Sequence, residues 1–97
     1  MKNVDEIINI MKKEKPLLIS KYLIREIGIF GSYVRGEQKK RSDLDILIDF
    51  YDAPDLFTFI EIENYLKKKI GIKVDLVSKS ALKPVIGKYI MNEVIFI

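Results

Sequence analysis

The stretch GSYVRGEQKKRSDLDILIDF, residues 31–50, decides the fold and the chemistry of this 97-residue chain. A small polar pair, Gly31 and Ser32, ends one apolar run, and ten residues later Asp43 and Asp45 open the next. Ten residues are enough for a short helical turn, a basic loop and the return of the chain. The stretch therefore combines a phosphate-sized anion site with a metal-sized carboxylate pair, which suits chemistry on a nucleoside triphosphate.

The two acids of this stretch are the first candidates for a metal site. Asp43 and Asp45 are predicted to share one face of a strand over residues 44–50, about 6–7 Å apart along the chain. Carboxylates that close repel each other unless a cation lies between them, and Mg²⁺ or Mn²⁺ suits oxygen ligands. Asp49 lies on the same face but roughly 13 Å further along, so we interpret it as structural or peripheral. Taken alone, such a pair is equally often a loop acid beside a solvated strand residue.

Gly31 and Ser32 are the candidate phosphate site. Glycine lets the backbone approach an anion closely, and the N–H groups of a turn that opens a helix favour phosphate. The Ser32 hydroxyl adds one donor. Alone, a Gly-Ser pair is usually only a turn, and the acids ten residues later strengthen the prediction. Four cations follow in residues 35–41, namely Arg35, Lys39, Lys40 and Arg41. Such a charge run is usually just a solvated loop. Arg35 is the expected triphosphate ligand among them, because the short helical turn fixes its position.

Asp75 is the third acid, in the otherwise apolar run KVDLV at residues 73–77. A carboxylate in such a strand is costly without a partner. If this strand pairs beside the strand of residues 44–50, Asp75 can face the same cation as Asp43 and Asp45. The alternative is a half-exposed strand face on which Asp75 simply meets water.

The rest of the chain predicts one α/β (α+β) domain over residues 1–97, with a small mixed sheet flanked by helices. A helix capped by Asn3 is expected to stop before Pro16, which opens a second, short helix. The predicted helices cover residues 4–13, 16–22, 56–70 and 80–91, the last with a break near Pro84 and Gly87. The predicted strands cover residues 27–30, 44–50 and 74–77, with an edge strand at 94–97.

Composition excludes several kinds of chemistry. The chain has no cysteine and no histidine, which excludes disulfides, a thiolate nucleophile, structural zinc and histidine acid–base catalysis. A net charge of +3 is too small to indicate a nucleic-acid binder. No apolar run approaches the ~18 residues of a membrane span, and the N-terminus lacks the apolar stretch of a signal peptide. We therefore expect a soluble cytoplasmic domain.

Together these motifs closely resemble the nucleotidyltransferase superfamily related to DNA polymerase beta, and within it the minimal nucleotidyltransferases (MNT), the antitoxins of HEPN/MNT toxin–antitoxin pairs. The resemblance implies a polymerase-beta palm-like fold, with Asp43, Asp45 and Asp75 as catalytic metal ligands. It also implies that Gly31 and Ser32 bind the triphosphate of ATP and that two Mg²⁺ ions, or Mn²⁺, are the cofactors. Tyr33 and Val34 depart from the arginine and alanine often found in the family's GSxARG motif, whereas Arg35 and Gly36 retain the remainder.

The resemblance implies transfer of AMP from ATP to a protein hydroxyl, with a tyrosine of a HEPN ribonuclease toxin as the expected acceptor. Under this hypothesis the chain is the antitoxin, and a hetero-oligomer with the toxin is expected. The alternative is a non-catalytic antitoxin that neutralises its HEPN partner by binding. All three acids and the Gly-Ser turn are present, which favours the enzyme. Nucleotide addition to RNA, and direct nucleic-acid binding in general, is the weaker hypothesis because the chain has no second domain to hold RNA.

Overall fold

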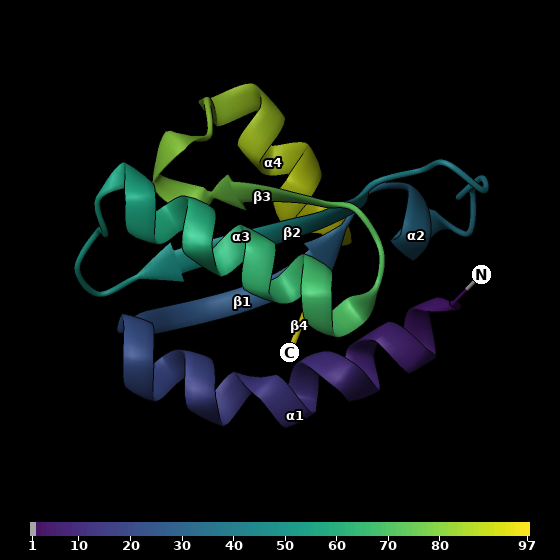
Figure 1. Ribbon diagram of the computed structural model, residues 1–97. Helices are drawn as coiled ribbons and strands as arrows, with labels where there is room; N and C mark the ends of the chain where they lie inside the picture. The colour runs from purple at the N-terminus through teal and green to yellow at the C-terminus, as the bar shows by residue number, and fades with distance from the viewer. Residues whose placement is uncertain (1) are drawn as a thin grey trace.

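A four-stranded mixed sheet organises the structure, a computed structural model that describes residues 2–97 (Figure 1). The elements in chain order are α1 (Val4–Tyr22), β1 (Ile24–Phe30), α2 (Ser32–Arg35), β2 (Leu44–Phe50), α3 (Leu56–Ile70), β3 (Val74–Ser78), the 3-10 helix η1 (Lys79–Ala81), α4 (Pro84–Glu93) and β4 (Ile95–Phe96). The strand order is β3-β2-β1-β4. β2 pairs parallel with β3, while β1 pairs antiparallel with both β2 and β4. The predicted mixed sheet flanked by helices is confirmed.

One face of the sheet carries the hydrophobic core. Figure 1 shows α1 and α3 side by side on this face, α1 along β1 and α3 along β3. From β2, the side chains of Leu44, Ile46 and Ile48 are fully buried here, as the alternation of the strand predicts. α3 has its expected bounds because Asp55 accepts a hydrogen bond from Thr58 N–H at its start and Gly71 ends it in a left-handed conformation.

Helix α1 is continuous, so the predicted break at Pro16 is wrong. Asn3 caps it as expected, accepting from Glu6 N–H at 2.9 Å. Proline within a helix removes one hydrogen bond to the carbonyl four residues earlier. Here Pro16 lies on the exposed side, where water can replace that bond. Met11 and Leu18, before and after Pro16, are both buried in the core, and this packing holds the two halves in one helix.

Strand β1 begins three residues earlier than predicted. Leu23 adopts a left-handed conformation (φ 55°) that ends α1, and Ile24 then pairs with Phe50 of β2. The charged residues Arg25 and Glu26 concealed this start, since they lie at an irregularity in the register where the strand bulges.

The C-terminal segment covers part of the other face of the sheet. The predicted helix of residues 80–91 is split near Pro84, as expected: η1 ends at Ala81, and Pro84 is the first residue of α4. The break expected near Gly87 is wrong, because Gly87 lies within α4. The predicted edge strand is present but short, with Ile97 N–H donating to Ile27 O at 2.9 Å just beyond β4. Among residues 2–97 no helix is long and apolar enough to cross a membrane; the cytoplasmic location stays a prediction.

Candidate active site

The register of the sheet brings the predicted motifs together. Asp45 pairs with Phe30 of β1 on one side and with Asp75 of β3 on the other. Gly31 follows Phe30 directly, so the turn and the second and third acids lie in one row across three strands. Paired residues of neighbouring strands are about 4.8 Å apart and point to the same face. Asp75 therefore faces the same side as Asp43 and Asp45, as required for a shared site.

Gly31 fits closely against Asp45. Its backbone (φ 83°, ψ −154°) is a conformation that essentially only glycine adopts. Its carbonyl accepts hydrogen bonds from the backbone N–H groups of Val34 and Arg35, which starts α2. A Cβ added at Gly31 would lie 2.1 Å from Asp45 Oδ2. Position 31 therefore requires glycine for two reasons besides ligand binding: the backbone conformation there, and the close approach of the Asp45 carboxylate.

The electrostatics of the site centre on Asp45. Partial burial, together with the nearby charges of Asp75, Asp43 and Glu93, raises the pKa of its carboxyl from 3.8 to about 6, against the opposing effect of Arg35. Repulsion of this kind favours a bound cation, and the donors are carboxylate oxygens, the ligands that Mg²⁺ prefers. Within residues 2–97 no three acidic side chains converge closely enough to hold a metal ion as they stand. Asp75 is exposed on an edge strand, so the metal-ligand assignment stays a prediction.

Glu93 is the residue of the site that the sequence did not reveal. It is the last residue of α4, and its Oε2 accepts from Gly31 N–H at 2.5 Å. Arg35 Nη1 donates to both carboxylate oxygens of Glu93, at 2.9 and 3.1 Å, and Arg35 Nε donates to Glu37 at 3.0 Å. These carboxylates raise the pKa of the Arg35 guanidinium above its ordinary value. No local pattern marks Glu93, because only the path of α4 across the sheet brings it to Gly31.

Two cavities flank the acidic residues. One, of about 340 Å³, lies between the end of β1 and α4 and is lined in part by Gly31, Arg35, Asp45, Tyr89 and Glu93. It is therefore bounded by the predicted phosphate turn, two acids and an exposed aromatic ring.

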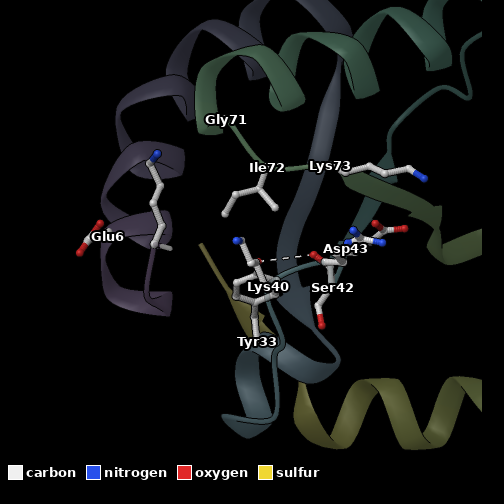
Figure 2. A pocket seen from close by; sticks show the side chains of 10 residues that line it. Glu6, Tyr33, Lys40, Ser42, Asp43, Gly71, Ile72 and Lys73 are labelled. Atoms are coloured by element: carbon white, nitrogen blue, oxygen red, sulfur yellow. Dashed lines mark hydrogen bonds between the residues drawn. The ribbon is translucent and has the colours of Figure 1, made fainter.

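The larger cavity, of about 600 Å³, adjoins Asp43 (Figure 2). Side chains from α1, from the loop after α2 and from the turn before β3 surround it. Four of its lining residues are cationic, namely Lys2, Lys40, Arg41 and Lys73. The cations between Gly31 and Asp43 thus divide: Arg35 of α2 lies on the Gly31 side of the site, whereas Lys40 and Arg41 of the basic loop line the cavity at Asp43.

The sequence matches the nucleotidyltransferase domain model over residues 4–97. The chain belongs to this family. It is 48% identical over 97 residues to the protein adenylyltransferase MntA of Thermococcus cleftensis, covering 100% of this chain and 98% of the relative. The identity extends over the whole domain, so this chain is a nucleotidyltransferase enzyme, and the predicted resemblance to minimal nucleotidyltransferases is confirmed.

Solved structures agree with this assignment. The chain superposes on a minimal nucleotidyltransferase with a TM-score of 0.75 and 26% identity, covering 92% of this chain and 93% of that one. It also superposes on a chain of a toxin–antitoxin complex with AMP-PNP, with a TM-score of 0.72 and 24% identity, covering 98% and 72%. The second similarity shows the fold alone.

In this nucleotidyltransferase the unusual Tyr33 is a structural residue. Its ring is buried, with 3% exposed, and belongs to the core, while its hydroxyl donates to Ser42 O at 3.5 Å (Figure 2). It therefore ties α2 to the end of the basic loop just before Asp43. Asp49, in contrast, accepts from its neighbour Phe50 N–H at 3.1 Å, and its structural or peripheral role stays a prediction.

Proposed function

We propose that this nucleotidyltransferase moves AMP from ATP to a hydroxyl of a HEPN toxin, with tyrosine as the acceptor, and so acts as the antitoxin of the pair. The observation that carries the proposal is the row Phe30–Asp45–Asp75, which sets the Gly31 turn beside the acids. A triphosphate at the turn would have its α-phosphate next to the carboxylates. The similarity to protein adenylyltransferase MntA supports a protein acceptor.

In this mechanism the three aspartates would hold Mg²⁺, two ions by the family resemblance, or Mn²⁺. Bound divalent ions would neutralise the triphosphate and stabilise the departing pyrophosphate. The Gly31 N–H, the Ser32 hydroxyl and the Arg35 guanidinium bind phosphate oxygens and hold the nucleotide in place. Positioning and charge neutralisation account for most of the rate enhancement in such reactions, so no histidine is needed.

Asp75 is the residue assigned to the acceptor. It is exposed on β3, an edge strand of the sheet, so a macromolecule can approach it without displacing α1 or α3. We assign its carboxylate to receive the proton of the attacking hydroxyl. A 97-residue domain has little surface for gripping a large acceptor, so the toxin supplies its own docking surface.

The second candidate function is neutralisation of the partner by binding alone. One observation favours it: α4 exposes Val85, Ile86 and Tyr89, at 70%, 54% and 75%, beside the site. Apolar side chains clustered on one exposed helix are typical of protein–protein contact. The two functions differ in whether the partner is covalently changed.

The deciding experiment is intact-mass spectrometry of a co-expressed HEPN protein after incubation with ATP and Mg²⁺. Wild type should add one or more AMP groups to the partner. Asp75→Asn should bind the partner but leave its mass unchanged. Asp49→Asn is the matched control, since it neutralises an acid of β2 outside the cluster and should transfer normally. A partner that stays unmodified, yet is silenced equally by wild type and Asp75→Asn, would establish the binding-only function instead.

Metal removal tests the carboxylate assignment separately. Without a divalent ion the acids would repel the triphosphate, so ATP should bind only with Mg²⁺ or Mn²⁺ present. Calorimetry in buffer with chelator, compared with buffer containing Mg²⁺, measures this directly. Equal affinity in the two buffers would exclude metal-mediated binding at the three aspartates.

A further inference from the structure

A carboxylate of the chain itself already occupies the donors assigned to the nucleotide. Gly31 N–H donates to Glu93 Oε2 at 2.5 Å, and Arg35 Nη1 donates to both oxygens of the same carboxylate. A planar anion with two oxygens on a backbone N–H and a guanidinium reproduces the contacts that a phosphate group makes. The donor set is thus an anion site, and Glu93 is its occupant.

The position of Glu93 is otherwise unfavourable for an acid. It is the final residue of α4, where the helix dipole disfavours negative charge. It also lies close enough to Asp45 to raise the pKa of that carboxyl. The side chain nevertheless is only 25% exposed and is turned onto Gly31 and Arg35. The anion site therefore attracts a carboxylate strongly enough to offset both repulsive effects.

We propose that Glu93 is an internal competitor for the anion site and thereby sets the affinity for the nucleotide. The inference rests on the proposed function, because it takes Gly31 and Arg35 as triphosphate donors. A phosphate group reaches these donors only when the Glu93 side chain has turned away. If the site is free about one tenth of the time, the apparent Kd is roughly tenfold higher than the intrinsic one.

The exchange requires only a side-chain rotation. The chain just after Glu93 is held to β1, where β4 pairs with Gly28 and Ile29. Val94 packs so closely that a Cβ on Gly28 would lie 2.7 Å from it. Lys15 Nζ also donates to the Ile97 carbonyl at 2.5 Å. Because α4 is fixed at this end, substitutions of the partly exposed Glu93 should alter the anion site without unfolding the helix.

The test is calorimetric binding of inorganic pyrophosphate, and separately of ATP with Mg²⁺, to wild type and three variants. Glu93→Gln removes the charge, and Glu93→Asp keeps the charge but is too short to reach Gly31 and Arg35 together. Glu37→Gln is the matched control, since Glu37 contacts the same guanidinium but not Gly31. Both Glu93 variants should bind pyrophosphate roughly tenfold more tightly than wild type, and Glu37→Gln should resemble wild type.

An independent readout is the Gly31 amide resonance, since the chain has only five glycines. This signal should move in both Glu93 variants and should respond to pyrophosphate at lower concentration in them than in wild type. Unchanged or weaker pyrophosphate binding in Glu93→Gln would overturn the inference. Tighter binding in Glu93→Gln but not in Glu93→Asp would also overturn it, because charge repulsion without competition for the donors explains that pattern. Absence of pyrophosphate binding in every protein would also overturn it. Tighter pyrophosphate binding in both variants without ATP binding in any protein would support Glu93 as the competitor for an anion site, but would reject ATP as the ligand of that site and with it the proposed function.

Discussion

On one face of the sheet, α1 and α3 bury a continuous apolar layer that includes Ile46; on the other, charged face, α4 borders a cavity that Asp45 also lines. These two neighbours in β2 point to opposite faces and experience opposite environments. Ile46 is fully buried among aliphatic side chains. Asp45 is partly buried beside other carboxylates, and burial together with their charge raises its pKa to about 6.

This contrast separates what stabilises the protein from what serves its chemistry. The face covered by α1 and α3 stabilises the protein through burial of apolar area. The other face holds like charges together and exposes apolar residues of α4, both of which cost stability in the absence of ligands. Such local conflicts with the rest of the fold are expected at functional sites.

The largest effect should come from the charged face. Asp45→Asn should reduce AMP transfer by at least about a thousandfold, because electrostatic stabilisation is usually the largest catalytic contribution. Single-turnover transfer to the HEPN partner, measured on folded protein, tests this. Transfer near the wild-type rate would mean that Asp45 does not take part in catalysis, and would contradict the assignment of catalysis to the charged face.

The next largest effect should come from the apolar face. Ile46→Ala should lower the free energy of unfolding by about 2–5 kcal/mol through lost burial and a residual cavity. Transfer per folded molecule should stay close to wild type, since Ile46 faces away from the site. Urea unfolding and the transfer assay measure the two quantities separately. A loss of transfer without a loss of stability would contradict the assignment of this face to stability alone.

The glycines near the site give a smaller and more specific contrast. Gly31 and Gly36 both have positive φ, 83° and 71°, but a Cβ at Gly36 meets nothing within 4 Å. Gly36→Ala should therefore cost only about 1–2 kcal/mol of backbone strain and leave transfer unchanged. Gly31→Ala should cost about 1–3 kcal/mol in its backbone alone, displace Asp45 and slow transfer, although by less than Asp45→Asn does. Urea unfolding and the transfer assay compare the two variants. If both variants gave the same stability and the same transfer rate, the close contact between Gly31 and Asp45 would not contribute to function.

The same contrast explains what the sequence could predict. Strand alternation in β2 is a local signal that predicts the burial of Leu44, Ile46 and Ile48, and Asp55 and Gly71 are local signals for the bounds of α3. Alternation does not predict that Leu47, on the face of Asp45, is buried as well. Pro16 misled because packing on both sides of it outweighs one lost hydrogen bond. The sequence alone did not determine whether β3 pairs beside β2, on which the alignment of Asp75 with Asp45 depends; the observed register shows that it does. Glu93 could not be predicted, because its role arises only from where α4 crosses the sheet.

The smallest effect concerns stability and pH. Asp45 has a folded-state pKa of about 6, against 3.8 for the ordinary carboxyl, so the folded state holds the proton more tightly than the unfolded state. This lowers the free energy of unfolding as pH rises from about 3.8 to about 6, and the full penalty is present above that range. Below about 3.8 both states are protonated and the penalty disappears.

Asp45→Asn should therefore stabilise the metal-free protein near neutral pH. A shift of this size corresponds to about 3 kcal/mol at most, and solvent screening of the partly exposed carboxylate reduces the expected gain to about 1–2 kcal/mol. At about pH 4 the variant and wild type should be nearly equal in stability. Urea unfolding with chelator at both pH values measures the difference. A gain of equal size at both pH values would show that packing of the amide, and not relief of charge repulsion, stabilises the variant.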